Sequence, residues 1–463
     1  MRPATSSAYR LFHEGAIALS RMESVGLPVN PAKLATAQAE VTDKIRQSSA
    51  ILRKHEIYQI QQRKFGKECS LGSRDQLAWV LYGHMQLPGA TKSEAGRYKL
   101  DENALLALDN DYVTEFLKLQ KFQKLKGTYL DAFSREIVDG RVYGSLNLNT
   151  VKSFRGSAEA PNLNNLPSRN VGITRYVKST ICPPDGQYIV EIDYSALEVH
   201  VAACYHKDPT MIDNLNTGYD MHTAVSKQCY KYGDDWIRDN LKLAKVLRTA
   251  AKSDAVFSWF YGNYYVDVAL RLWKTAVKTG MVDYLASKGI KRLGLTYDFV
   301  EKKWIEQPGP DAMVTHIKEV EHDFWKVRYP EYDQWRRDWY QSYQQKGYCH
   351  TLSGFTWWGA EKRNFIINMP IQGSAFHLLL RAITTIDAEI RRTRMRSRLF
   401  LEVHDSLLAI VPKNELHDYV AMANYHMTTK IKQDNPWVIL PLKTETEISD
   451  VSWFDKVAYT GRE

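Results

Sequence analysis

The sequence predicts an α+β protein, because long helical stretches alternate with a few short β-like runs. The β-like runs occupy residues 141–148, 187–193 and 399–411, and the alternation of side chains typical of a strand is clearest from Tyr188 to Asp193. No Pro-, Gly- or Ser-rich linker divides the N-terminal helical part from this mixed part. We therefore expect the two parts to pack as one unit.

The N-terminal part is expected to be helical. Residues 8–60 read as long amphipathic helices, broken at Gly26-Leu27-Pro28 and resuming from Pro31 to about Ile60. Short helical pieces then alternate with turn signals such as Pro88-Gly89 up to Leu108. A further helix is expected from Asp111 to Lys126, and its lysines either face water, as charge runs usually do, or grip a nucleic-acid backbone.

Composition and charge narrow the class of protein. The chain has 463 residues, 44% hydrophobic and 25% charged, which suits a globular protein with several packed subdomains. The net charge of +9 favours a polyanionic partner. The 5 cysteines are widely spaced and form no CxxC pair, which argues against a disulfide framework or a zinc site. Without a secretion signal or a long apolar run, the protein is expected in the cytoplasm, away from membranes.

Two aspartates are candidate metal ligands. Asp193 ends the strand from Tyr188, and Asp405 lies at the turn of a strand-turn-strand pattern from Leu401 to Leu408. If both strands join one sheet, the pair can hold Mg²⁺, which uses one or two carboxylates together with substrate phosphates. An isolated aspartate at a strand end is more often a cap or turn residue.

A third group of residues suits a nucleoside triphosphate. Arg248 and Lys252 are four positions apart on one helix face, where they can meet phosphates. Phe257, Phe260 and Tyr261 follow and offer an apolar surface for a base. Taken alone, the segment also fits an ordinary amphipathic helix with two solvent-facing cations.

Together these segments resemble, in order and spacing, the polymerase motifs of family A (polymerase I-type) DNA polymerases. Motif A is similar to Asp193-Tyr194-Ser195-Ala196-Leu197-Glu198 with the later Asp208-Pro209 and Asp220-Met221-His222-Thr223, motif B to Arg248-x-x-x-Lys252 with Phe257-x-x-x-Tyr261-Gly262, and motif C to Val403-His404-Asp405. The resemblance extends to Lys124–Tyr129, Pro161–Pro167 and Asn368–Ala375. Chance agreement of six ordered segments is negligible.

The resemblance implies a right-hand polymerase fold, with an antiparallel sheet in the palm and helices in the fingers and thumb. We expect the thumb and an N-terminal helical region in residues 1–140, palm with motif A in 141–206, fingers in 207–345 and palm with motif C in 346–463. The stretch from Gly262 to Pro330 is longer than is typical of the family, which predicts an insertion around residues 270–318.

The resemblance also implies an activity: template-directed addition of dNTPs to a primer 3′-hydroxyl. Two Mg²⁺ ions, for which Mn²⁺ can substitute, would be held by Asp193, Asp405 and the Tyr194 carbonyl. The residues expected to bind the dNTP are His222, Arg248, Lys252, Phe257, Tyr261 and Glu198, with Lys252 also the proton donor to pyrophosphate and Glu198 excluding a 2′-hydroxyl.

Primer-template DNA is the other implied partner. Arg155 and Gln372 match positions that touch its minor groove, Asn165 and Asn368 support that surface, and His404 completes the DNA-binding set. A purely structural hydrogen-bonding role is the alternative for these residues. Two rival functions are an RNA-copying polymerase of the same fold and a catalytically impaired DNA-binding relative.

The sequence departs from the family in motif B, where Phe257 follows Lys252 by five positions instead of four. On a regular helix the two would lie about 140° apart instead of about 40°. Either a π-bulge restores the common face, or Val256 and Phe260 form the base platform. We favour the bulge, because the Phe-x-x-x-Tyr-Gly spacing is intact.

Other departures are smaller. Ser406 stands where the family usually has an acidic residue after motif C, and Asn364 stands where an arginine is common, with Arg363 beside it. The chain begins almost at the thumb, so we expect no 3′-5′ exonuclease domain, and either a separate exonuclease or replisome protein as partner or an error-prone enzyme. The compact size suggests a bacteriophage origin.

Overall fold

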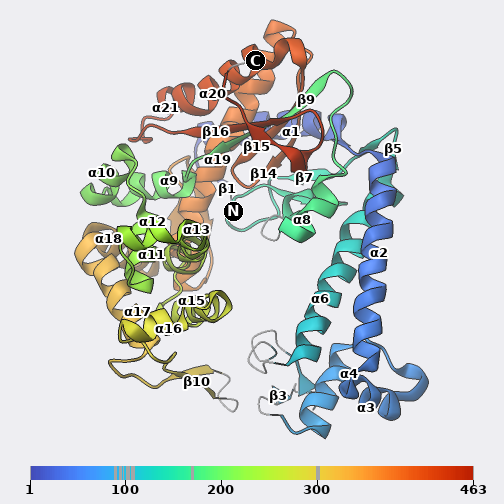
Figure 1. Ribbon diagram of the computed structural model, residues 1–463. Helices are drawn as coiled ribbons and strands as arrows, with labels where there is room; N and C mark the ends of the chain where they lie inside the picture. Colours follow the sequence, from blue (N-terminus) through green and yellow to red (C-terminus); the bar gives the residue numbers. More distant parts are fainter. Residues whose placement is uncertain are drawn as a thin grey trace.

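The protein folds into a region with a β-sheet from which two helical arms extend (Figure 1). This computed structural model describes residues 2–87, 91–92, 96, 98–100, 105, 110–167, 171–298 and 303–461. The turn signal at Pro88-Gly89 lies outside the described residues. No helix of the described part is long and apolar enough to cross a bilayer.

The main sheet is antiparallel, with strand order β14-β15-β9-β16-β17. Its strands are β9 (Gln187–Tyr194), β14 (Arg398–Val403), β15 (Ser406–Pro412), β16 (Thr444–Ser449) and β17 (Val457–Ala458). Successive side chains of β15 enter different hydrophobic clusters: Leu407 and Ala409 pack in one, and Leu408 and Ile410 in the other. Because a strand alternates its side chains, this interior strand is buried on both faces of the sheet, and its register is strongly determined.

Two long helices cover one face of this sheet. They are α1 (Ser6–Val25) and the 31-residue α19 (Arg363–Thr393), and both contribute to the larger core cluster. Gly15 of α1 lies so close to Leu380 of α19 that a Cβ would stand 2.8 Å from its side chain, so glycine permits this approach. The buried hydrophobic residues of α1 therefore pack with the sheet region.

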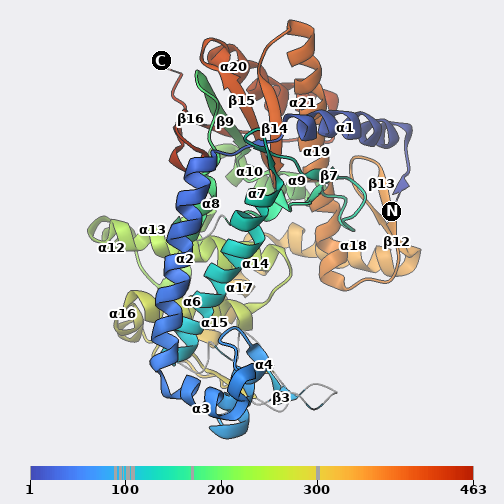
Figure 2. The same ribbon diagram turned by 90° about the vertical axis from the view of Figure 1, so that its right-hand side faces the viewer.

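One arm, on the right in Figure 1, is built on the long helices α2 (Pro31–Lys54) and α6 (Asp111–Leu125), which lie side by side (Figure 2). Helix α2 begins at Asn30, whose side chain accepts from Lys33 N–H, with Pro31 in the first turn. It ends at His55, which also caps α3 (Glu56–Phe65), so the helical run expected from Pro31 to about Ile60 consists of two helices that meet at His55. A smaller helix, α4 (Arg74–Ala78), belongs to the core at the tip.

The second arm, on the left in Figure 1, is almost entirely helical. Its elements are α10 (Pro209–Thr217), α11 (Met221–Tyr230), α12 (Asp234–Asp239), α13 (Leu241–Ala250), α14 (Phe257–Phe260), α15 (Tyr265–Thr279), α16 (Val282–Ser287), α17 (Met313–His322) and α18 (Pro330–Lys346). The region expected to hold an insertion also carries the antiparallel hairpin of β10 (Leu295–Asp298) and β11 (Lys303–Glu306).

Small sheets join these parts at the edges. Strand β5 (Ile137–Val138) pairs with β6 (Arg141–Val142), which pairs with β2 (Leu27–Pro28), so one hairpin crosses the boundary expected at residue 140. The β-like run from 141 to 148 is divided between β6 and β7 (Ser145–Asn147), and β7 pairs instead with β8 (Ser157–Glu159). A further sheet joins β1 (Arg2–Pro3), β13 (Phe355–Trp358) and β12 (Tyr348–His350).

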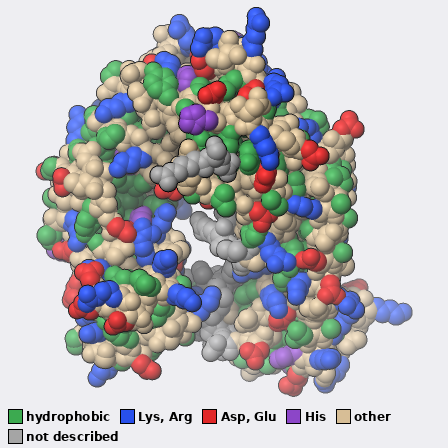
Figure 3. Space-filling view, turned by 45° about the horizontal axis from the view of Figure 1, so that its top comes forward, with side chains coloured by type: hydrophobic (Ala, Val, Ile, Leu, Met, Phe, Trp, Pro, Cys, Tyr) green, Lys and Arg blue, Asp and Glu red, His purple; other side chains and the backbone are tan. Residues whose placement is uncertain are grey.

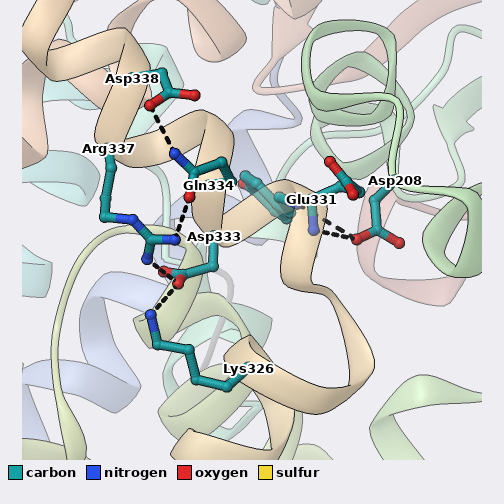
Figure 4. A network of polar contacts seen from close by, with 8 residues as sticks. Asp208, Lys326, Glu331, Asp333, Gln334, Arg337 and Asp338 are labelled. Carbon is teal, nitrogen blue, oxygen red and sulfur yellow. Dashed lines mark hydrogen bonds and ion pairs between the residues drawn. The ribbon is translucent and has the colours of Figure 1, made fainter.

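A buried aspartate joins the starts of two helices of the second arm (Figure 4). Asp208 is fully buried directly after α9 (Leu197–His206); its Oδ1 accepts from Met211 N–H at 3.0 Å and caps α10. Its Oδ2 accepts from the backbone N–H groups of Glu331 and Tyr332, at 3.1 and 3.3 Å, in the first turn of α18. One carboxylate therefore satisfies orphan donors of two helices at once.

The same helix start carries an ion network drawn in Figure 4. Asp333 accepts hydrogen bonds from Lys326 and Arg337, and Arg337 also donates to Gln334 Oε1 at 2.6 Å. Partial burial opposes ionisation of Asp333, but these two cations lower the pKa of its carboxyl. The negative charge therefore persists at the N-terminus of α18, where the helix dipole favours it.

Candidate active site

The sheet brings the two candidate metal ligands together. Strands β9 and β15 pair with Asp193 opposite Ser406, and the Tyr194 N–H donates to the carbonyl of Asp405 at 3.3 Å. Asp405 lies in the tight turn between β14 and β15, where the preceding His404 has φ = 61°. Residues 212 positions apart (405 − 193) therefore meet at one edge of the sheet.

The electrostatics of this pair suit a cation. Asp193 is exposed to solvent, but the surrounding protein excludes much of the water that would stabilise its charge. This desolvation, followed by the negative charges of Asp405, Glu191 and Glu445, raises the pKa of the Asp193 carboxyl to about 7. Burial, followed by the charge of Glu198, raises the pKa of Asp405 to about 6. Two carboxylates that resist ionisation in each other's presence gain from a divalent cation between them.

The donor set is small and composed of oxygen. Within the described ranges no group of three or more His, Cys, Asp and Glu side chains converges on one point. The Tyr194 hydroxyl donates to the Met427 carbonyl at 2.7 Å in the core, so only the backbone of Tyr194 is available at the strand end. Two carboxylates and a carbonyl fit Mg²⁺, which commonly completes its shell with water and substrate phosphate.

A cationic cluster lies on the helical arm. Arg248 of α13 makes a two-point contact with Asp220, from Nε to Oδ2 at 2.8 Å and from Nη2 to Oδ1 at 3.0 Å. Asp220 also caps α11, accepting from Thr223 N–H at 3.1 Å. Sequence reasoning missed this partnership, although Asp220 stands two positions before His222. The contact holds the guanidinium in place beside the start of α11.

His222 and Lys252 complete the cluster. Burial, then the neighbouring charges of Lys252 and Arg248, lower the pKa of His222 to about 4, so its imidazole is neutral near pH 7. Its Nδ1 is buried and has no hydrogen-bond partner in the described part of the chain. The Lys252 ammonium lies 5.6 Å from the centre of the Phe257 ring. The three side chains expected to face phosphate thus lie close together, and His222 Nδ1, unpartnered among the described residues, can hydrogen-bond to a ligand.

The helix carrying these residues contains the expected π-bulge. Residues Ala251–Val256 form a π-helical turn between α13 and α14, and the N–H of Phe257 donates to the carbonyl of Lys252, five positions earlier. One turn of this wider helix therefore places Phe257 on the face of Lys252. Val256 is fully buried, so the alternative platform of Val256 and Phe260 on an unbroken helix is excluded.

The aromatic residues border a cavity shared with the sheet region. Phe257, Tyr261, Glu198, Asn368 and Gln372 all line it. Phe260 lines it too, while packing against Phe324, Trp325 and Tyr332. The Glu198 carboxylate accepts from the Tyr261 hydroxyl and contacts the Arg155 guanidinium. Six of the residues singled out in the sequence therefore line the same cavity.

A second cavity, of about 220 Å³, holds other expected DNA-facing residues. Arg155, Asn165 and His404 line it, and so do Asn164 and Glu402, which sequence reasoning did not single out. Glu402 lies three positions before Asp405 in the strand of motif C. The sequence did carry one signal for Glu402: an acidic residue directly before motif C, in a segment expected to contact DNA.

The departures from the family pattern are accommodated locally. Ser406, in place of an acidic residue, donates its hydroxyl to the Val403 carbonyl at 3.0 Å and closes the turn around Asp405. Asn364 donates to the Gly262 carbonyl at 3.0 Å, beyond the aromatic end of the motif B helix. Gly262 has φ = 85°, and a Cβ there would stand 2.4 Å from the Asn364 side chain, so glycine is required at this turn.

Known proteins share both the sequence pattern and the fold. A model of DNA polymerase family A matches residues 35–306 and 315–455. DNA polymerase I of Geobacillus stearothermophilus is 24% identical over 458 residues, and that of Lactococcus lactis subsp. cremoris is 25% identical over 455 residues. In both cases the match covers 94% of this chain and 44% of the relative, so the chain spans less than half of those proteins.

A solved structure has a similar fold. The polymerase domain of Pol1 from M. smegmatis, in complex with DNA primer-template and dNTP, matches with a TM-score of 0.74 at 22% identity. The match covers 96% of this chain and 70% of that one. An antiparallel palm sheet between a helical thumb and helical fingers defines a right-hand polymerase fold. The family match covers most of the sequence, and the chain belongs to DNA polymerase family A.

Proposed function

We propose that the chain is a template-directed DNA polymerase that adds dNTPs to a primer 3′-hydroxyl. The observation that carries the proposal is the placement of Asp193 and Asp405 at one sheet edge. His222, Arg248 and Lys252 cluster on the fingers, as the incoming triphosphate requires. In Figure 3, Lys and Arg side chains border the hollow between the two arms, which suits a nucleic-acid partner.

The metal pair is assigned to Asp193, Asp405 and the Tyr194 carbonyl. Two Mg²⁺ ions, or Mn²⁺ in their place, would activate the primer hydroxyl and neutralise charge on the triphosphate. The two aspartates must be ionised to serve, and their raised pKa values mean that this state is reached only near neutral pH. Their proximity therefore makes cation binding and carboxylate ionisation mutually dependent.

The fingers residues are assigned to the triphosphate. Arg248 and Lys252 supply charge-assisted hydrogen bonds to phosphate oxygens, and Lys252 donates a proton to the departing pyrophosphate. His222, neutral at pH 7, donates from whichever ring nitrogen carries its proton. Phe257, one turn of the π-helix after Lys252, and Tyr261 are assigned to stack on the base.

Substrate choice is assigned to Glu198. The contacts that Glu198 makes with Tyr261 and Arg155 hold its side chain at the cavity wall, where it blocks a 2′-hydroxyl and favours deoxynucleotides. Arg155, Asn165, His404, Asn368 and Gln372 are assigned to primer-template DNA, which they meet through hydrogen-bonding groups at two adjoining cavities.

Primer extension tests the proposal. The chain should extend a matched primer on a DNA template with dNTPs and not with rNTPs, and only with Mg²⁺ or Mn²⁺; equally efficient extension on an RNA template would favour the RNA-copying rival. Asp405→Asn should abolish primer extension. The control variant Asp418→Asn, at an exposed position of α20 (Leu416–Tyr425), should extend the primer as the wild type does. Extension by Asp405→Asn at the wild-type rate would refute the metal assignment.

A further inference from the structure

A polar pair lies in the wall of the cavity that holds Arg155, Asn165 and His404. Its members are Glu402, on strand β14 and 2% exposed, and Asn164, on the short 3₁₀ turn Leu163–Asn165. Asn164 Nδ2 donates to Glu402 Oε1 at 2.9 Å. The pair joins the strand of motif C to the loop that carries Asn165.

The amide of Asn164 is only partly satisfied. Its Oδ1 is buried and accepts no hydrogen bond from any residue that the structure describes. An ionised carboxylate offers acceptors alone, whereas a neutral carboxylic acid adds one O–H donor. A neutral Glu402 would therefore supply, beside the bond it already accepts, the kind of group that the Asn164 carbonyl lacks.

The surroundings of Glu402 give its charge little compensation. Arg155 is the cation facing it, and the Arg155 guanidinium is already engaged by Glu198. The other titratable group at the cavity is His404, from the turn after β14, and α19 contributes the apolar Phe376. A Cβ on Gly156 would stand 2.8 Å from Glu402 Oε1, so the backbone also presses closely on the carboxyl.

Burial is the dominant effect on this group. It raises the pKa of Glu402 to about 7, against the opposing influence of the Asn164 hydrogen bond and the Arg155 charge. A primer-template laid over the cavity would remove further water and bring phosphates nearby. Both changes disfavour the carboxylate relative to the neutral acid.

We propose that Glu402 is a positioning residue that holds Asn164 against the primer-template as a neutral carboxylic acid, so that DNA binding takes up one proton from solvent at the Glu402 carboxyl. The inference rests on the proposed function, because it places DNA over this cavity. Beyond that function, the inference couples DNA binding to the uptake of a proton and places that proton on Glu402.

The sign of the pH dependence follows from the linkage. The free protein titrates Glu402 near pH 7, and the complex titrates it at a higher pH. Below the lower pKa the affinity is independent of this group. Between the two pKa values the dissociation constant rises about tenfold per pH unit, because each complex must first capture a proton.

Equilibrium binding of a fluorescent primer-template, without divalent cations and at constant ionic strength, tests the proposal. The dissociation constants of the wild type and Glu402→Gln are compared from about pH 6 to 9, the range in which the linkage acts. Glutamine mimics the neutral acid, so the ratio of the two constants should rise about tenfold per pH unit above pH 7. Other groups, such as Asp193 and Asp405, cancel in this ratio.

Glu159→Gln is the matched control. Glu159 also accepts from an asparagine amide, that of Asn147 at 3.0 Å, but its side chain is exposed. Its substitution should leave the wild-type pH dependence intact. Infrared difference spectra give a second readout: DNA binding at pH 8 should increase the carbonyl band of a protonated carboxylic acid in the wild type, and not in Glu402→Gln.

Distinct outcomes separate the failures. A ratio that stays constant with pH, or a folded Glu402→Gln protein that binds weakly at every pH, would overturn the assignment of a neutral Glu402. A wild-type chain that binds no primer-template at any pH would instead overturn the proposed function. Thermal unfolding of both variants confirms that each measurement reports on folded protein.

Discussion

Deleting Ser253 should convert the π-helical turn of motif B into regular α-helix while keeping its side chains aligned. In the protein, Phe257 N–H bonds to the Lys252 carbonyl five positions back. With Ser253 removed, the same ring follows the lysine by four positions, about 40° around a regular helix. The lost side chain is exposed and bonds only to the backbone of its own helix, at Thr249 and Ala250.

The matched comparison is deletion of Ala250, between Arg248 and Lys252. That change rotates Arg248 by about 100° relative to Lys252 and everything after it. A charge-assisted hydrogen bond to phosphate is worth about 1.5–3 kcal/mol. Loss of the arginine contact should therefore weaken dNTP use by about 10- to 150-fold, since 1.4 kcal/mol corresponds to tenfold.

Steady-state single-nucleotide incorporation measures the effect as kcat/KM for the dNTP. For the Ser253 deletion, kcat/KM should stay within about tenfold of the wild-type value, because a larger loss would correspond to at least one lost hydrogen bond to phosphate. The Ala250 deletion should fall well below it. If the Ser253 deletion were the more damaging of the two in folded protein, the alignment of Lys252 with Phe257 by the π-turn would not be what the nucleotide requires.

Three further results are expected. Asp208→Ala should destabilise the fold by about 3–5 kcal/mol in urea unfolding, because charged hydrogen bonds to buried N–H groups are each worth about 1.5–3 kcal/mol and add incompletely; a loss equal to that of the exposed Asp213→Ala would contradict the double-cap role. Primer extension should fall as pH drops from about 7 to 6, because Asp193 and Asp405 take up protons in this range. Added Mg²⁺ should shift the pH profile to lower pH, and a profile independent of Mg²⁺ would contradict metal binding by these two carboxylates. Asp193→Asn should raise the melting temperature at pH 8 while abolishing extension, because a carboxyl whose folded pKa is raised costs stability once ionised; an unchanged or lower melting temperature would speak against that cost.

Local patterns were sufficient to predict β9, β14 and β15 and to select the candidate residues at their ends. The alternation from Tyr188 to Asp193 predicts β9, and the pattern around Asp405 predicts the β14-β15 turn, because side-chain periodicity is a local property. The π-turn was also predictable, since an extra residue between two otherwise intact spacings leaves few ways to keep one face. The roles assigned to these residues, the domain boundaries, the absence of an exonuclease, the cytoplasmic location and the bacteriophage origin stay predictions.

Other features depend on contacts between distant segments. No local signal ends α2 at Lys54, where His55 caps the next helix, nor pairs Asp220 with Arg248 across 28 positions. The burial of Glu402 arises from Asn164, 238 positions earlier, together with Gly156 and α19. A hydrogen-bond partner or a desolvated carboxyl is a property of the packed surroundings, and the chain pattern carries no record of it.

The sequence by itself determined the α+β class, the polymerase family pattern and the two aspartates, because each is written in residue type and spacing. Only the tertiary structure decided which charges are compensated: Arg248 by Asp220, Asp208 by two helix starts, and Glu402 by almost nothing. Ionisation depends on the water and charges that folding places around a group. The same type of side chain is therefore a helix cap in Asp208, a proposed metal ligand in Asp193 and a proposed neutral acid in Glu402, according to its place in the fold.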